Sequence, residues 1–437
     1  MTEGMHDSIA EAVAAWPSLS GAERTQLFRS LRRDGREELF LSLHAQDQEQ
    51  LLWEMPPHER LTYLRVLAPD DAADVIQAAH PQDRDGLLNL LDELSRTEVS
   101  ALLAYAEDDA GGLMSPRFAR LRPEMTVDEA ISYLRLQGRQ METIYDAYVL
   151  DSDQLLLGGV SLRDLFTANG RAKVVEVMNR KIISVSENTD QEEVARLFAA
   201  EGLAAVPVLD DAGRMKGIVT VDDIVDVVQE EATEDFQKIG GMEALQGPYL
   251  ETGLRQMIAK RAGWLAALFL GEMLTATAMS RYEGAIEKAV ILAVFIPLII
   301  SSGGNSGSQA TTLIIRAMAL GEVRLRDWWR VARREVLSGM TLGAVLAIIG
   351  FIRIVVWQAI GLGYGEHYLL LAATVSISLV GVVLFGTITG AMLPFILRRV
   401  GLDPASASAP FVATLVDVTG LIIYFSVANI ILRGTLL

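Results

Sequence analysis

Residues 297–316 of this sequence read PLIISSGGNSGSQATTLIIR. An apolar run meets a cluster of small and polar residues at 303–309, and the apolar run then resumes. Unpaired backbone groups are costly in hydrocarbon, so irregular backbone at membrane depth survives only inside protein or beside water. We expect an interruption of the span here and interpret it as part of a passage for a polar solute. Close helix packing through Gly and Ser is the alternative interpretation, and the amides of Asn305 and Gln309 weigh against it.

The chain of 437 residues has two halves of opposite charge. Residues 1–253 hold 47 acidic and 23 basic side chains, whereas residues 254–437 hold 9 acidic and 15 basic ones. Such acidity argues against nucleic acid as a partner, because nucleic acid requires a basic surface, and it suits a cation. The absence of Cys excludes disulfides, thiolate catalysis and Cys-based metal sites. Residues 1–20 lack the basic start of a signal peptide, so we expect the acidic half to stay in the cytoplasm.

Residues 20–110 predict helices only, because Leu residues recur there at helical spacings with polar residues between them. Proline punctuates the segment at positions 56, 57, 69 and 81. Short helix pairs stacked as a small solenoid fit this pattern, and an irregular helical bundle fits it nearly as well.

An internal repeat decides the fold of residues 112–228. Leu113–Pro116 corresponds to Val177–Arg180, and Gly158–Asp164 corresponds to Gly217–Asp223. Each unit predicts the order strand, helix, strand, turn, strand, helix. The two units resemble a tandem pair of CBS domains, which usually sense a ligand and perform no chemistry.

Five apolar stretches that are each long enough to cross a bilayer follow the repeat, and they cover residues 262–280, 289–317, 335–358, 368–397 and 410–432. Eleven basic residues flank these spans on the side that carries the acidic half, against three on the other side. This bias predicts a cytoplasmic N-terminus and a C-terminus outside. The sequence therefore predicts a multidomain membrane protein, with an all-α acidic N-terminal domain (1–111), an α/β tandem CBS pair (112–226), a connecting helix (227–253) and an α-helical membrane domain of five spans (254–437).

Asp417 is the most distinctive polar residue within the spans. An ionisable group inside a membrane span is a functional candidate by default. Asp417 shares a helix face with the small residues Ala413 and Gly420, along which helices approach closely. No Lys lies inside a span and Arg353 belongs near an outer end, so a hydrated cation is the natural counter-charge; a protonated Asp that joins helices is the alternative. Glu272, in the first span, is either a polar packing residue or a pore-lining one.

The donors near the small-residue stretch are all oxygens. Hard cations such as Mg²⁺ take oxygen ligands, and Mg²⁺ keeps several of its waters. One carboxylate per subunit with amide and carbonyl oxygens would hold a hydrated ion through those waters. Oxygen donors favour Mg²⁺ without excluding Co²⁺, Mn²⁺ or Ni²⁺.

A run of acids without any base precedes the membrane half, and it comprises Asp222, Asp223, Asp226, Glu230, Glu231, Glu234 and Asp235. Like charges three or four residues apart destabilise an isolated helix, so we expect compensation. Water and salt would suffice, and divalent cations that bridge this helix to another acidic surface are the sharper hypothesis. Candidate surfaces start two other helices, at Asp70, Asp71 and Asp74 and at Asp190 and Glu192, where acids alone would serve as helix caps.

These features together resemble the MgtE family of magnesium channels over nearly the whole chain. The most specific motifs are Pro297–Asn305, Glu231–Asp235 and Asp417–Tyr424. The resemblance implies a homodimer in the bacterial inner membrane that conducts Mg²⁺ inward without ATP hydrolysis. It also implies that the pore lies between the subunits, where Asp417 holds hydrated Mg²⁺ with Ala413 and Asn305 beside it.

The resemblance further implies a cytosolic Mg²⁺ sensor, whose ligands in this sequence would be Asp70, Asp74, Asp190, Glu192, Asp223, Asp226, Glu231, Glu234, Asp235 and Glu38. Bound Mg²⁺ would neutralise their repulsion, draw the domains together and close the pore, as a two-state switch biased by its ligand. The family often has Asn in place of Ser308 and an acid in place of Gly202. These departures bear on the polar ring of the pore and on the number of regulatory ions.

A second class of function is a membrane-tethered nucleotide sensor. Ser161 with Asp164, and Thr220 with Asp223, match the ribose-contacting pattern of CBS domains that bind nucleotides such as ATP. We expect no enzyme, because no Walker motif is present and the five His residues are scattered.

Overall fold

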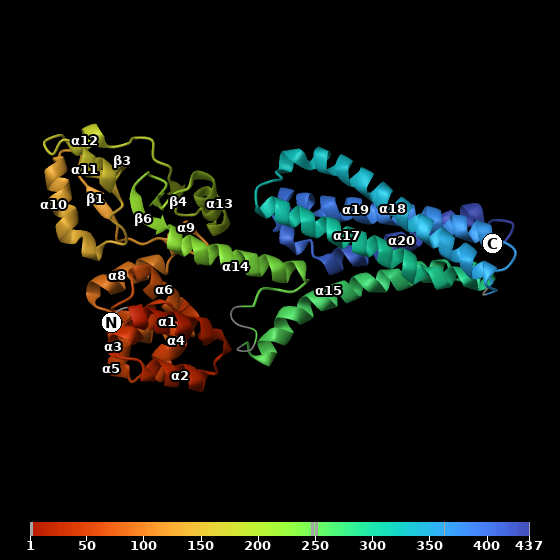
Figure 1. The fold of residues 1–437 in the computed structure, drawn as a ribbon, viewed down its shortest axis with the longest axis horizontal. Coiled ribbons are helices and arrows are strands. Elements are labelled where there is room, and N and C mark those ends of the chain that lie inside the picture. Colours follow the sequence, from red (N-terminus) through yellow and green to blue (C-terminus); the bar gives the residue numbers. More distant parts are fainter. Residues whose placement is uncertain (1–2, 246–248, 250–251, 362, 437) are drawn as a thin grey trace. The chain divides into compact units, whose positions relative to one another are not determined.

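A computed structural model of the chain describes residues 3–245, 249, 252–361 and 363–436. The chain forms two compact units, residues 1–229 and 230–437. Helix α14, Val221–Ile239, contains the boundary between them. Figure 1 shows the elements of both units.

The first part of unit 1 is a set of short helices, which confirms the prediction of helices only. They are α1 (Glu3–Ala15), α2 (Gly21–Ser30), α3 (Arg33–Leu41), α4 (Ala45–Glu54), α5 (Pro57–Leu64), α6 (Pro69–Ala78), α7 (Arg84–Leu88), α8 (Glu93–Leu102) and α9 (Ala110–Leu113). Two of the prolines begin helices, at α5 and α6, where the missing N–H has no partner to lose. Helix α6 packs between α4 and α8, and its apolar face is fully buried.

The second part of unit 1 repeats one motif twice, which confirms the predicted CBS pair. The first motif contains β1 (Ala119–Leu121), α10 (Val127–Gln137), β2 (Asp146–Leu150), β3 (Leu156–Ser161) and α11 (Leu162–Thr167). The second contains α12 (Val174–Val177), β4 (Val185–Ser186), α13 (Gln191–Glu201), β5 (Ala205–Leu209), β6 (Met215–Thr220) and α14. In each motif the first strand pairs parallel with the second, and the second pairs antiparallel with the third. Both hairpins shift register at the same place, after Val149 and after Val208.

The two motifs exchange equivalent contacts. Ser115, ahead of the first motif, bridges to Ile218 in the last strand of the second, and Asn179 bridges back to Gly159. The repeated sequence segments therefore occupy matching places in the pair.

Helix α9 ties the helical part of unit 1 to the second CBS motif. The backbone N–H groups of Ala110 and Gly111 donate to the carbonyls of Thr189 and Glu187, at 2.8 and 2.9 Å. One continuous hydrophobic core runs from the helices into this motif. The helical part is thus seated on the second motif in this structure.

The predicted connecting helix is not a separate element. It was expected to start at residue 227, but α14 runs without a break from Val221, so the last helix of the CBS pair continues directly into it. Val221 follows the last strand at once, and the buried Ile224 and Val227 hold the first turns on unit 1.

Among its described residues, unit 2 contains five helices that are long and apolar enough to span a membrane, as predicted: Leu254–Arg281, Val290–Ala319, Leu325–Ala359, Tyr368–Arg399 and Ala409–Ile431. The α-helices are α15 (Leu254–Arg281), α16 (Glu283–Lys288), α17 (Ile296–Ala319), α18 (Trp328–Ala359), α19 (Tyr368–Arg399) and α20 (Ala409–Ile431). Helix α17 packs on α19 and α20, α18 packs on α19, and α15 lies along α20 (Figure 1). Among the described residues of α15 only Thr275 is buried.

Candidate functional site

The small-residue stretch of α17 is a regular helix, so the predicted interruption of the span was wrong. Helix α17 continues through all of residues 303–309. Its backbone groups therefore pair within the helix and need no water. The glycines provide close packing, which was the alternative interpretation: a Cβ on Gly386 or Gly390 of α19 would overlap the carbonyl oxygen of Gly303 or Gly307. The hydroxyl of Thr311 donates to the carbonyl of Gly390 at 2.8 Å across the same contact.

The opposite face of α17 carries the polar residues. Ser301, Asn305 and Gln309 follow one another at intervals of four, and all three are exposed. The amide nitrogen of Asn305 donates to the hydroxyl of Ser301 at 3.5 Å. A helix that spans hydrocarbon cannot leave such a row against lipid without cost. Within residues 303–309, the glycines therefore pack against α19, and Asn305 and Gln309 present amide oxygens on the opposite face.

Helix α20 packs on α17 and carries the other two expected pore residues, Ala413 and Asp417. A Cβ on Gly304 would lie 3.5 Å from the Cβ of Ala413, so the two helices approach closely where the predicted pore residues sit. Asp417, one turn further along α20, is partly buried. The carboxyl of Glu272 on α15 lies within hydrogen-bonding distance of the Asp417 carboxyl.

Ser308 couples α17 to the start of α20. Its hydroxyl donates to the carbonyl of Ala409 at 3.2 Å. The next residue back, Ser408, caps α20 by accepting from the N–H of Phe411 at 3.3 Å. The indole of Trp264 on α15 donates to the same Ser408 hydroxyl at 3.1 Å. Ser308 therefore helps to hold the start of α20 in place and does not belong to the exposed polar row.

Unit 1 gathers carboxylates from three separate segments. Asp70 and Asp71 begin α6, Glu142 precedes β2, and Asp222, Asp223 and Asp226 lie on α14. We call these six residues the acidic cluster; their charges act on one another. The segments belong to the helical part, the first CBS motif and the end of the second, so the cluster lies where all three meet.

Asp70 is the most enclosed member of the acidic cluster. Its residue is 7% exposed, and its Oδ1 atom is buried without a hydrogen-bond partner in the structure. Burial raises the pKa of the Asp70 carboxyl well above its ordinary value, and the neighbouring charges of Glu142, Asp223 and Asp71 raise it further. A buried carboxylate without a counter-charge is costly, so the site favours a cation or a proton.

Asp223 belongs to the same cluster, and its carboxylate accepts two hydrogen bonds. Its Oδ2 accepts from the hydroxyl of Thr220 at 2.6 Å and from the Thr220 N–H at 3.3 Å. Burial raises the pKa of Asp223 to about 7; the bonds from Thr220 oppose the rise, and the charges of Asp222 and Asp71 add to it.

Glu142 was missed by the sequence analysis. Burial raises its pKa, the 3.1 Å hydrogen bond from the Ser115 hydroxyl opposes the rise, and the charges of Asp71 and Asp222 add to it. The residue lies in a loop without a repeat, a cap or a charge run around it. No local signal marked it, since only the fold brings it to α6 and α14.

Asp190 and Glu192 have other partners. Asp190 caps α13 by accepting from the N–H of Glu192 at 2.9 Å. Glu192 forms an ion pair with Arg196 at 2.5 Å. Gly202 ends α13 in the left-handed conformation, with φ of 65°, which glycine adopts without strain.

The remaining sensor candidates fall on different elements. Asp74 lies exposed on α6, and Glu38 lies partly buried on α3, which packs on α1 and α2. Glu231, Glu234 and Asp235 lie on the part of α14 that belongs to unit 2. Of these, Glu234 pairs with Lys238, whose amino group also contacts Asp403 at 2.7 Å.

In the part of the chain that the structure describes, no three Asp, Glu, His or Cys side chains converge closely enough to hold a metal ion. The acidic cluster has the hard oxygen donors that Mg²⁺ prefers, and its wider spacing suits an ion that retains water ligands.

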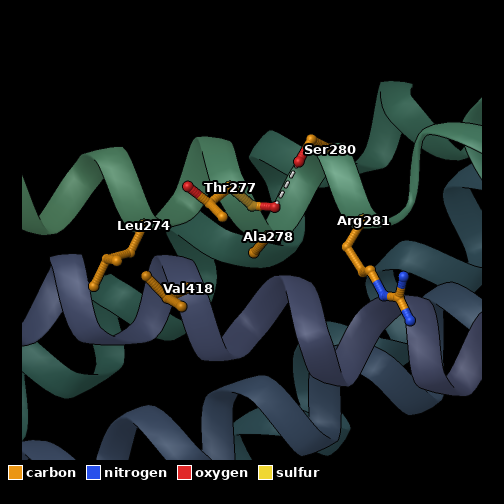
Figure 2. A pocket seen from close by; sticks show the side chains of 6 residues that line it. All are labelled: Leu274, Thr277, Ala278, Ser280, Arg281 and Val418. Carbon is orange, nitrogen blue, oxygen red and sulfur yellow. Dashed lines mark hydrogen bonds between the residues drawn. The ribbon is translucent and has the colours of Figure 1, made fainter.

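A groove of about 710 Å³ lies between the C-terminal part of α15 and α20. Figure 2 shows its lining residues, Leu274, Thr277, Ala278, Ser280, Arg281 and Val418. The hydroxyl of Ser280 is bonded to the Thr277 carbonyl at 2.8 Å. No acid is among these lining residues, and Val418 is the sequence neighbour of Asp417.

Comparison with known proteins agrees with this architecture. The family model for the MgtE intracellular N domain matches residues 7–108, the CBS domain model matches 110–170 and 174–230, and the model described as MgtE, divalent cation transporter, matches 296–427. The magnesium transporter MgtE of Thermus thermophilus is 44% identical over 84% of this chain and 80% of its own length. The protein of the same name from Bacillus subtilis is 32% identical over 82% of this chain and 78% of its own.

Two solved structures are also similar. One is the cytosolic domain of the Mg²⁺ channel MgtE in complex with ATP, at 42% identity and a TM-score of 0.47, covering 50% of this chain and 90% of that one. The other is the soluble part of a magnesium transporter, at 30% identity and a TM-score of 0.43, covering 52% of this chain and 99% of that one.

The fold and the matches together define a class: a multi-pass membrane protein with a CBS pair and a helical N domain. Within that class, the chain belongs to the MgtE family. This is a family of transporters and not of enzymes.

Proposed function

We propose that this chain is a Mg²⁺ channel of the bacterial inner membrane, closed when cytosolic Mg²⁺ binds its acidic half. Relatives named magnesium transporters support the choice of ion, and oxygen-only donors favour it on chemical grounds. The N-terminus faces the cytoplasm and the C-terminus faces outside, as the basic residues predict.

The pore runs between two copies of the chain. Asp417 holds the hydrated ion, Ala413 contributes its carbonyl, and Asn305 an amide oxygen. What supports this assignment is that Asn305 is exposed on a membrane helix while Gly304 beside it packs on Ala413. A second subunit that faces this polar row would enclose an aqueous path, which would remove the cost of exposing it to lipid.

The acidic cluster of unit 1 carries the proposal for regulation. Asp70, Asp223 and Asp226 come from segments that only docking of the helical part brings together, and their like charges oppose that docking. A divalent cation among them would reverse the sign of the interaction and stabilise the docked form. The secondary candidates are Asp74, Asp190, Glu192 and Glu38 in unit 1, and Glu231, Glu234 and Asp235 in unit 2.

Flux into liposomes tests the channel. Wild type should admit Mg²⁺ when the cytosolic face is kept Mg²⁺-free, and the Asp417→Ala variant should not. Equal flux through both would overturn the pore assignment. Competition by Co²⁺, Mn²⁺ and Ni²⁺ during flux distinguishes the ions, since a Mg²⁺ channel is blocked weakly by the others.

A second candidate function is nucleotide sensing by the CBS pair. The hydroxyl of Ser161 donates to Asp164 at 2.7 Å, which repeats the bond of Thr220 to Asp223. Asp223 belongs to the acidic cluster, so the first motif is the freer candidate for ATP. Calorimetry of the purified protein with ATP, with and without Mg²⁺, separates a nucleotide site from the ion site.

A further inference from the structure

A second carboxylate lies inside the membrane unit next to Asp417. Glu272 stands on α15, nine residues before its outer end at Arg281, which at 1.5 Å per residue places it about 13 Å deep. Its side chain is exposed. An exposed acid near the middle of a membrane span cannot face lipid without a large cost, so Glu272 faces water, a cation or a partner group.

The packing of α15 on α20 fixes where Glu272 points. A Cβ on Gly271 would come within 2.8 Å of the Thr414 side chain, so α15 approaches α20 closely at this level. That approach brings the Glu272 carboxyl to within hydrogen-bonding distance of Asp417. In the described part of unit 2, no basic side chain forms an ion pair with either acid.

A buried hydroxyl lies one turn along α15 from Glu272. Thr275, one turn after Glu272, is 8% exposed, and its Oγ1 has no hydrogen-bond partner in the structure. A helical Thr normally donates to the carbonyl four residues back, so this donor and acceptor is left available at the α15–α20 contact. This hydroxyl is available to hydrogen-bond a water ligand of an ion held by the Glu272 and Asp417 carboxyls.

We propose that Glu272 is a second ion-handling carboxylate of the pathway, so that each chain contributes a Glu272–Asp417 pair rather than one Asp. The inference rests on the proposed ion pathway at Asp417. Two adjacent carboxylates attract a divalent cation more strongly than one and hold it through its waters at a wider span. Glu272 therefore sets how tightly the pathway binds the permeating ion.

The test is Mg²⁺ flux into liposomes against external Mg²⁺ concentration, with the cytosolic face Mg²⁺-free. The Glu272→Gln variant keeps the shape of the side chain and should raise the half-saturating Mg²⁺ concentration about tenfold. Glu272→Asp, which keeps the charge, should shift it less. Glu283→Gln, which removes an exposed acid just beyond α15, is the matched control and should leave the curve unchanged.

The variants also separate this inference from the proposed pathway. In an Asp417→Asn background with residual flux, Glu272→Gln should add less than it does alone, because the pair is already broken. If Asp417→Asn abolishes saturable flux while Glu272→Gln behaves as wild type, the pathway stands and the second carboxylate is refuted. If wild type and Asp417→Asn conduct equally, the pathway itself fails. Size-exclusion profiles and thermal unfolding identify any variant that has lost its fold, in which case Glu272→Asp decides.

Discussion

Replacing Asp223 with Asn should remove a pH-dependent cost that opposes docking of the helical part on the CBS pair. In the docked structure burial raises the pKa of Asp223 from 3.8 to about 7. Undocking returns part of its environment to water, where the pKa is close to ordinary. The docked form therefore holds a proton more tightly, so its stability is full at low pH and is lost as pH rises through about 7.

The magnitude follows from these two values. With a docked pKa of about 7, Mg²⁺-free docking should weaken between pH 6 and pH 8 by at most about 1.4 kcal/mol, or about tenfold in the docked-to-undocked ratio. The Asp223→Asn side chain keeps an oxygen that accepts from Thr220 and carries no charge at either pH. Its Mg²⁺-free docked fraction at pH 8 should exceed that of wild type even at pH 6, where the undocked Asp223 carboxyl is still ionised, and its pH dependence over this range should be smaller than that of wild type.

The absence of Cys makes a distance assay direct. Spin labels on Gln82→Cys in the helical part and Asp153→Cys in the first CBS motif, both exposed positions, report docking in the full-length protein. Asp211→Asn, at an exposed acid, is the charge-matched control and should retain the wild-type pH response. Identical distance distributions for wild type at pH 6 and pH 8 would refute the reasoning, as would a full pH response in Asp223→Asn.

Three further changes probe unit 2. Lys238→Met should weaken closure at high cytosolic Mg²⁺, seen as residual flux, because Lys238 contacts Asp403 in the α19–α20 connection at 2.7 Å; unchanged closure would show that this ion pair is dispensable. Gly390→Val should destabilise the membrane unit by several kcal/mol and lower the unfolding temperature in detergent, because any side chain there overlaps the backbone of α17; a wild-type melting curve would contradict that packing. Ser308→Ala should cost about 1 kcal/mol of unfolding free energy through loss of its bond to Ala409, with ion selectivity preserved, and a change in selectivity would instead place Ser308 in the pore.

Much of the fold could be predicted because its signals are local and repeated. The CBS pair follows from two copies of one pattern, and the structure repeats even the register shift after Val149 and Val208. The five spans follow from length and hydropathy alone. The start of α14 could not be placed, because nothing in the sequence between Val221 and Val227 distinguishes a helix that ends from one that continues.

The site was predicted less completely, for physical reasons. Glycine and serine in a span serve either an irregular backbone or close packing, and only the partner helix decides; here α19 requires Gly303 and Gly307. Glu142 reaches the acidic cluster by tertiary folding alone, without a sequence signal. Asp190 and Glu192 were expected at the sensor, and the structure shows a helix cap and an ion pair with Arg196, interactions that cation binding would have to compete with or use.

Mg²⁺ current in excised inside-out patches, recorded while Mg²⁺ on the cytosolic face is raised, tests the central claim most directly. Inward Mg²⁺ current should flow at low cytosolic Mg²⁺ and close steeply as that concentration rises. Asp70→Asn with Asp223→Asn, which removes both the repulsion and two candidate ligands, should make closure depend less steeply on cytosolic Mg²⁺. A current that ignores cytosolic Mg²⁺, or one whose closure is unmoved by the two substitutions, would contradict a sensor built from the acidic cluster.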